Sequence, residues 1–174
     1  MKSNQDGVFT IELAFVLLFL SVLLVFTGDV AFQLFNRVNV DRASYSLVNV
    51  LKERTRFYDE NLVVTQAEVD DLYTLAARLL GYSHKPNIAS YGMRVESIVN
   101  GTFSSIDIQN NGGVPCISND SLINREHLVP QTSADKQFPL YQVTLCLYVD
   151  SWFNQFWADS TDHYVHSSSV MPGR

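Results

Sequence analysis

The residues whose spacing most clearly suggests chemistry lie at the amino terminus, where Gly7 and Val8 are followed by Glu12. Glu12 directly precedes an uncharged, mostly apolar run over residues 13–28. A carboxylate among lipid chains is costly, so this glutamate is either a functional group or a residue at the headgroup boundary. If the chain were cut after Gly7, Val8 would carry a free α-ammonium. Because a buried carboxylate needs a partner, the ammonium of a neighbouring copy would then favour assembly in register.

Residues 8–28 predict a helix that crosses a membrane. Glu12 is the only charged residue of the segment, whose 21 residues span about 30 Å as a helix and so match the hydrocarbon core of a bilayer. A cleaved secretory signal is disfavoured, because Lys2 is the only basic residue before the apolar run and no convincing small-residue cleavage site follows it. The segment is therefore expected to be either an uncleaved signal anchor or a helix processed at Gly7.

The sequence GVFTIELAF, which begins at Gly7, resembles the class III signal of type IV pilin-like proteins. These proteins have a glycine before the cut and a glutamate at position five of the mature chain. The segment is most similar to the TadE/TadF pseudopilins of bacterial tight-adherence (Tad) pili, with TadF favoured, and the similarity covers about residues 1–57. The leader MKSNQDG departs from the family in being poorly basic. Leu13, where major Flp pilins have a tyrosine, and the greater chain length favour a minor pilin or pseudopilin.

The resemblance implies a structural protein without cofactor or catalytic residues. An inner-membrane prepilin peptidase would cut between Gly7 and Val8, and Glu12 would position the processed subunit during assembly. The implied partners are a TadE-like pseudopilin, the Tad assembly platform and the major Flp pilin. The resemblance also implies a role in surface adherence, and a single pass through the bacterial inner membrane with a periplasmic head, or incorporation into the extracellular pilus. The alternative is an uncleaved signal-anchored protein with an extracytoplasmic ligand-binding head.

The helix is predicted to continue beyond the membrane as an amphipathic stalk. No proline or glycine interrupts residues 29–57, and apolar residues recur there at helical spacing. One helix is therefore expected over about residues 9–56, near 70 Å long if straight. The expected divisions are a leader (1–7), a transmembrane and assembly helix (8–28), an amphipathic extension (29–57), an extracytoplasmic head (58–157) and a loosely ordered tail (158–174).

The head is predicted to contain a second helix over residues 66–80. Thr65 and Glu68 form a capping-box pattern before an apolar helical face, and Gly81 is suited to end the helix. Together with the strands described next, this helix predicts an α+β fold.

An antiparallel sheet of at least three strands is predicted from alternating apolar residues. The predicted strands cover residues 93–99, 102–108 and 140–150. Asn100 and Gly101 form the favoured dipeptide of a two-residue hairpin, and closing the hairpin there sets Arg94 opposite Asp107 as a favourable charge pair. Residues 110–139 are rich in Gly, Pro, Asn and Ser and are expected to form a long loop.

Two groups of side chains in the head are candidates for a covalent link or a metal site. Cys116 and Cys146 are the only cysteines, and we expect a disulfide between them in an oxidising compartment, with separate thiols as the alternative. His163 and His166 have H-x-x-H spacing beside Asp162. That pattern alone is a weak metal signal, so surface histidines are favoured and no metal is predicted.

An aromatic cluster follows the third predicted strand and consists of Trp152, Phe153, Phe156 and Trp157. These side chains are expected to cap the core of the head. The functional alternative is a subunit-contact surface, because exposed Trp and Phe are enriched at interfaces.

Charge, length and motifs exclude several function classes. The 174 residues suit one modest domain with an appended segment, and the net charge of −6 with only 12 Lys and Arg argues against a nucleic-acid binder. The sequence contains no G-x-S-x-G, P-loop or dinucleotide fingerprint, so we expect no enzymatic activity.

Overall fold

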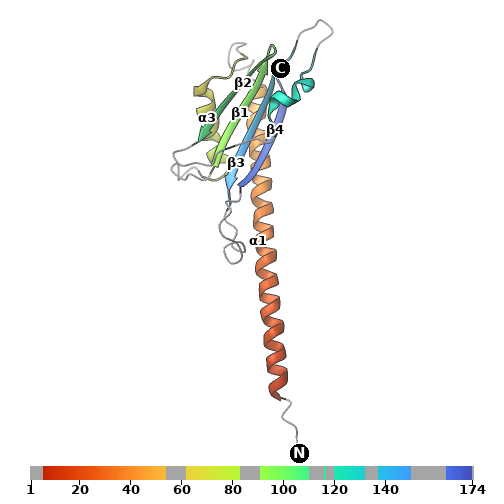
Figure 1. Ribbon diagram of the computed structural model, residues 1–174. Coiled ribbons are helices and arrows are strands. Elements are labelled where there is room, and N and C mark those ends of the chain that lie inside the picture. The colour runs from red at the N-terminus through yellow and green to blue at the C-terminus, as the bar shows by residue number, and fades with distance from the viewer. Residues whose placement is uncertain are drawn as a thin grey trace, which may run out of the picture.

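One long helix carries a small head around its carboxyl half (Figure 1). The computed structural model describes residues 6–53, 62–82, 91–109, 116, 120–131, 137–149 and 164–173. In chain order, the elements are helix α1 (Asp6–Lys52), helix α3 (Gln66–Leu79), strands β1 (Tyr91–Val99) and β2 (Thr102–Gln109), the 3-10 helix η1 (Leu122–Leu128), and strands β3 (Leu140–Tyr148) and β4 (Tyr164–Pro172). The α+β class predicted from the sequence is confirmed.

Helix α1 runs without interruption from the predicted membrane segment into the head. It ends at Lys52, a turn before the predicted residue 56, and residues 54–61 lie outside the described part of the chain. The buried residues of α1 begin at Val40. They recur every three or four residues, which places them on one side of the helix. The buried residues of α1 are Val40, Ala43, Ser44, Leu47, Val48 and Leu51.

The four strands form one antiparallel sheet in the order β2-β1-β3-β4. Asn100 and Gly101 connect β1 and β2 with φ angles of 50° and 74°, the positive values that a two-residue type I′ turn needs. The predicted register is confirmed, because Arg94 of β1 lies opposite Asp107 of β2.

Both helices cover one face of the sheet, with α1 against β3 and β4 and α3 beside it toward β2 (Figure 1). Strand side chains alternate between faces, so β1 and β3 direct Met93, Val95, Val143 and Leu145 toward the helices. All four are buried in the main hydrophobic core. The core thus joins the carboxyl half of α1 to the centre of the sheet.

Helix α3 is positioned by its ends and by a pair of tyrosines. The Glu68 carboxylate accepts a hydrogen bond from the backbone N–H of Thr65 at 2.7 Å, and Gly81 follows the helix with a φ angle of 83°. Tyr73 of α3 stacks on Tyr91 of β1 with ring centroids 4.5 Å apart, and each hydroxyl donates to the other's backbone carbonyl. Burial, followed by the neighbouring Tyr73, raises the pKa of Tyr91, so this phenol keeps its proton even in moderately alkaline solution.

The carboxyl-terminal residues form an ordered strand, so the expectation of a loosely ordered tail over 158–174 is wrong for residues 164–172. Strand β4 pairs with β3 along its whole length. Beyond it, the backbone N–H of Gly173 donates to the carbonyl of Pro139 at 2.7 Å. The head therefore does not end at residue 157, because β4 is the edge strand of its sheet.

Short polar side chains explain why this strand is inconspicuous in the sequence. The Oγ atoms of Ser167 and Ser169 in β4 lie 3.2 Å and 2.9 Å from the Oγ of Ser44 in α1. Ser44 is fully buried, so small side chains allow the helix to approach the strand closely. Packing against α1, rather than an alternation of large apolar residues, selects the extended conformation here.

Replacing Ser44 with leucine should destabilise the head by about 1–3 kcal/mol, because the larger side chain has no space between α1 and β4. Urea unfolding of the full chain in detergent micelles, followed by near-ultraviolet circular dichroism, measures this loss. Ser46→Leu is the matched control, since Ser46 is exposed on the same helix and its replacement should change stability by about 0.5 kcal/mol or less. Equal stability of the two variants would contradict the described packing.

Candidate functional site

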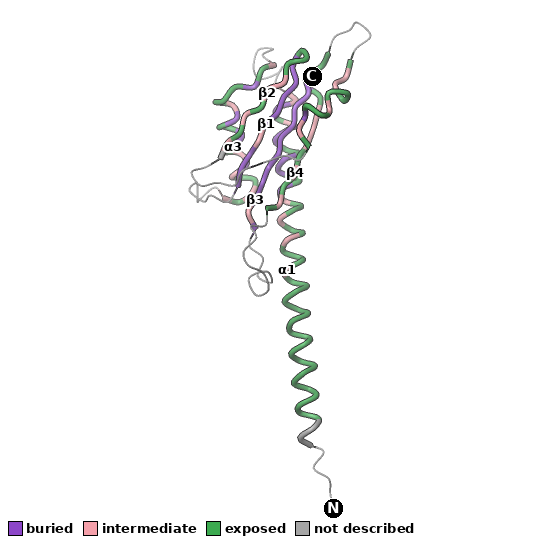
Figure 2. Tube along the Cα trace, in the orientation of Figure 1, coloured by how far each residue is buried: buried purple, intermediate pink, exposed green. Residues whose placement is uncertain are grey.

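The amino-terminal part of α1 projects from the head and is exposed around its whole circumference (Figure 2). Every residue over 9–28, here called the exposed arm, is solvent-exposed in the isolated chain. Phe15 and Phe19, for example, are each 69% exposed. Leaving apolar surface in water costs about 25 cal/mol per Å². The arm therefore needs lipid or other protein around it.

The polar groups of the exposed arm are compatible with a bilayer. Within the described residues, α1 is the one helix long and apolar enough to cross a membrane. The hydroxyls of Ser21 and Thr27 donate to the backbone carbonyls of Leu18 and Leu24 at 2.7 Å and 2.9 Å. Such bonds to the preceding turn remove most of the cost of placing a hydroxyl in hydrocarbon. Only the charge of Glu12 then remains uncompensated in the arm.

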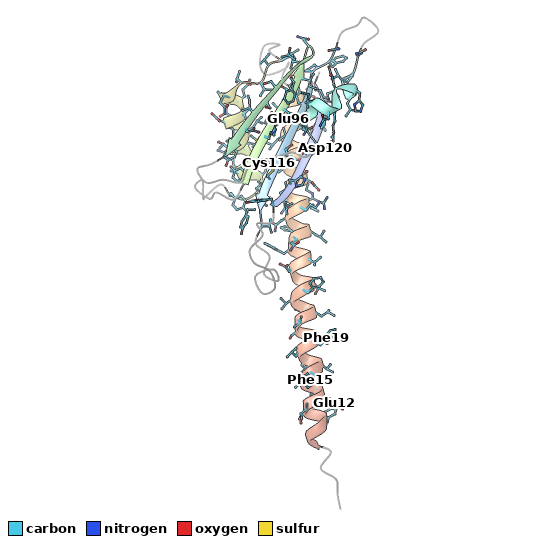
Figure 3. All side chains as sticks on the ribbon, in the orientation of Figure 1. Glu12, Phe15, Phe19, Glu96, Cys116 and Asp120 are labelled. Atoms are coloured by element: carbon cyan, nitrogen blue, oxygen red, sulfur yellow. A yellow bond between two sulfur atoms is a disulfide. The ribbon has the colours of Figure 1, made fainter. Side chains whose placement is uncertain are left out.

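Glu12 lies near the start of the exposed arm, with Phe15 and Phe19 on the following turns of α1 (Figure 3). Their spacings of three and seven residues place the three side chains on one side of the helix. No residue that the structure describes forms a hydrogen bond or ion pair with Glu12. Once water is excluded from the arm, this carboxylate requires a cation or a hydrogen-bond donor from another molecule.

The peptide bond between Gly7 and Val8 lies in the first turn of α1, because the helix begins at Asp6. The N–H groups of a first helical turn have no partner in a preceding turn, and glycine weakens a helix by roughly 1 kcal/mol relative to alanine. This turn can therefore open at low cost. The side chains of residues 1–8 lie outside the described part of the chain, so the cleavage site stays a prediction.

A disulfide and a packed segment lie on the second face of the sheet. Cys116 and Cys146 are bonded as expected, with Cα atoms 5.3 Å apart, and both are buried. Residues 120–131, which include η1 and are here called the cover segment, pack on the face opposite the helices. Leu122 of this segment is fully buried against side chains of β1 and β3. The expected long loop over 110–139 therefore contains a packed element.

Glu96 of β1 accepts three hydrogen bonds, two of which come from the cover segment. Its carboxylate is fully buried and accepts from the Nε of Arg94 at 2.9 Å, the Oγ of Ser121 at 2.9 Å and the backbone N–H of Leu122 at 2.7 Å. This role of Glu96 was not predicted, because a glutamate on the polar side of a strand is expected to face solvent. The predicted disulfide could have indicated that Glu96 is covered, since linking Cys116 to β3 brings the residues that follow Cys116 over this face.

Of the remaining candidates, the structure describes only His166. His166 lies exposed in β4, whereas Asp162 and His163 fall outside the described residues. In the described part of the chain, no group of three or more His, Cys, Asp and Glu side chains could hold a metal ion. The aromatic cluster also lies outside the described residues and comprises Trp152, Phe153, Phe156 and Trp157.

Comparison with known proteins extends the resemblance over the whole chain. A family model described as TadF, "Putative tight adherence pilin protein F", matches residues 1–174. No curated protein and no solved structure matches the chain. The family match therefore includes the head as well as the amino-terminal third on which the sequence resemblance rests.

Replacing Glu96 with glutamine should lower the free energy of unfolding by about 2 kcal/mol, because a neutral amide loses the charge-assisted bonds to Arg94 and the cover segment. Asp107→Asn is the matched control. The Oδ1 of Asp107 also lies 3.5 Å from the Nε of Arg94, but the Asp107 side chain is 47% exposed. Its replacement should therefore lower the free energy of unfolding by about 0.5 kcal/mol or less. Urea denaturation of the full chain in micelles, with the disulfide intact, measures both variants. Equal losses would contradict the role assigned to Glu96.

Proposed function

The chain belongs to the TadF family, whose model matches its full length, and we propose that it is a minor pilin or pseudopilin needed for Tad pilus biogenesis and surface adherence. The observation that carries this proposal is the exposed arm, an apolar helix surface on which Glu12 is the only charge. A subunit of a membrane-assembled fibre needs such a surface, because it exchanges lipid for contacts with other subunits. The head then lies beside the fibre axis rather than within the packed helices.

The proposed first step is cleavage between Gly7 and Val8 by a prepilin peptidase. The position of this bond in the first turn of α1 supports the proposal, because a terminal turn opens more easily than a central one. Glycine imposes no side chain on the approaching enzyme, and its flexibility favours the extended conformation that proteolysis requires. Cleavage would leave the α-ammonium of Val8 four residues before Glu12.

Glu12 is proposed to select the position of one subunit relative to the next. Four helical residues correspond to about 6 Å along the axis, so a neighbour displaced by this distance places its ammonium level with the Glu12 carboxylate. Unit charges 4 Å apart attract by about 4 kcal/mol at an effective dielectric constant of 20. A carboxylate near the middle of a bilayer costs roughly 2.5–3.5 kcal/mol. The attraction is therefore of the same order as the cost of burying one charge, and it is gained in only one register.

Family membership associates the protein with the Tad pilus machinery, and the long apolar helix suits a single-pass membrane anchor. We propose that the head is periplasmic, since the Cys116–Cys146 disulfide suits an oxidising compartment. The proposed partners are the prepilin peptidase, a TadE-like pseudopilin, the assembly platform and the major Flp pilin. Membership of a pilin family implies a structural protein, so the proposal requires neither catalysis nor a cofactor.

The aromatic cluster formed by Trp152, Phe153, Phe156 and Trp157 remains a proposed contact surface. Its support is the composition of the sequence alone, because large aromatic side chains are enriched where subunits meet.

Protein purified from membranes of a host that has the matching prepilin peptidase should have the mass of residues 8–174, measured by intact mass spectrometry. Gly7→Leu should retain the leader, because the larger side chain obstructs the cleaved bond. Gly28→Leu is the control and should be processed normally, since no atom lies within 4 Å of a β-carbon added there. An intact amino terminus in the unchanged protein would contradict processing and favour an uncleaved signal anchor.

Glu12→Ala should abolish or strongly reduce piliation while leaving the processed mass unchanged, because it removes the charge that is proposed to align subunits. Electron microscopy of surface pili and the intact mass of the protein measure the two effects separately. Asp41→Ala is the control, because Asp41 is an exposed acid of the same helix outside the arm. Normal pili in the Glu12 variant would overturn the proposed role of this carboxylate.

A further inference from the structure

A groove lies where α1 meets the first residues of β4, at the end of the head nearest the exposed arm (Figure 1). Its volume is about 310 Å³. The residues that line it include Val30, Gln33, Leu34, Arg37, Tyr164 and His166. It therefore combines two elements that are distant in sequence, and its residues on α1 follow the part of the helix that the proposed function places in a membrane.

The groove has an apolar side and a cationic side. Val30 and Leu34 are 40% and 57% exposed, so they present aliphatic surface that the head does not cover. Arg37 follows on the next turn of α1, is exposed, and forms no ion pair with any residue in the described ranges. Among the residues that the structure describes, none that lines the groove is acidic. Two carboxylates of α1 flank this stretch: Asp29, which accepts a hydrogen bond from the Nε2 of Gln33 at 3.1 Å, and Asp41, one turn after Arg37.

Arg37 also has a particular position along α1. It is the first basic residue after Lys2. If the exposed arm crosses the hydrocarbon core, Arg37 lies nine residues, about 13 Å, beyond it. The headgroup layer is about 5–7 Å thick, helical side chains lean toward the amino terminus, and arginine extends its charge toward an interface. The guanidinium therefore extends back toward the layer of lipid phosphates.

We propose that this groove binds the headgroup of an anionic phospholipid. Arg37 donates two parallel hydrogen bonds to the phosphate, an arrangement that its planar guanidinium favours. The imidazole of His166 supplies a further N–H on the opposite wall, from β4. The first methylenes of an acyl chain lie against Val30 and Leu34. This inference rests on the proposed insertion of the exposed arm, and it assigns a ligand to a site in which α1, just beyond the arm, meets the edge strand of the sheet.

Charge complementarity favours a lipid over another occupant. A basic residue near an anionic surface contributes enough binding free energy to favour anionic over net-neutral headgroups by about fivefold. The aliphatic residues adjoin the cation on the membrane side, which is the order of groups in a phospholipid. Free phosphate would use the cation alone, and a second copy of the chain would have to bring a carboxylate into the groove.

The test uses the full chain in nanodiscs made of equal parts phosphatidylglycerol and phosphatidylcholine, with retained lipids counted by native mass spectrometry. The unchanged protein should retain phosphatidylglycerol about fivefold over phosphatidylcholine. Arg37→Gln should bring the ratio close to one. Arg42→Gln is the matched control, because Arg42 is an exposed arginine of the same helix about 8 Å further from the membrane, and it should keep the preference.

Each other outcome overturns the proposal. Equal retention of the two lipids, or equal effects of Arg37→Gln and Arg42→Gln, would show that the groove has no headgroup preference. Displacement of the lipid by millimolar inorganic phosphate would identify a free anion as the ligand. A lipid-free species with two protein chains that is lost in Arg37→Gln would identify a second copy as the occupant. Incorporation into the nanodiscs is scored separately, because its failure would contradict membrane anchoring, whereas a lost lipid preference would not.

Discussion

The packing of α1 against β3 and β4 is the contact on which the rest of the molecule depends. Since the helix is continuous over Asp6–Lys52, whatever holds its carboxyl half also fixes the direction and rotation of its amino half. Ser44 sets the closeness of this contact through two serine hydroxyls of β4. Glu12 therefore faces a defined side of the molecule relative to the head. A subunit of this kind presents its charge and its head to neighbours in one geometry.

The two faces of the sheet are stabilised in different ways. The face beneath α1 and α3 is an apolar core, whereas the face beneath the cover segment buries Glu96, Gln142 and Thr144 completely. Buried polar groups stabilise a protein only when their hydrogen bonds are made, as they are for Glu96. The disulfide supplements this face, because closing a loop of 30 residues contributes roughly 3–4 kcal/mol in the chain-entropy model.

The sequence predicted those features that are encoded locally. Asn100 and Gly101 determine the hairpin through their own backbone preferences, and the continuous helix follows from a pattern without proline. Strand β4 could not be predicted, because its serines are selected by the distant Ser44 rather than by their neighbours. Glu96 was missed for a related reason, since its burial depends on a segment more than twenty residues away in the chain. The processing site at Gly7 and the role of Glu12 stay predictions, whose signal in the sequence is a fixed spacing.

The charges of α1 also mark the depth of a subunit that is held in a bilayer as proposed. Glu12 and Arg37 are 25 residues apart, about 37 Å along a helix. This distance exceeds the hydrocarbon core of about 30 Å but not the full bilayer of about 40–45 Å. Both charges can therefore approach headgroup layers at once, whereas Asp29, about 25 Å along the helix from Glu12, lies in the outer part of the core and shares a hydrogen bond with Gln33. In the proposed assembly, leaving the bilayer removes the solvation of Glu12 by headgroups, so a cation on another subunit replaces it. The same carboxylate would thus contact headgroups in a lone subunit and a neighbouring ammonium in the proposed fibre.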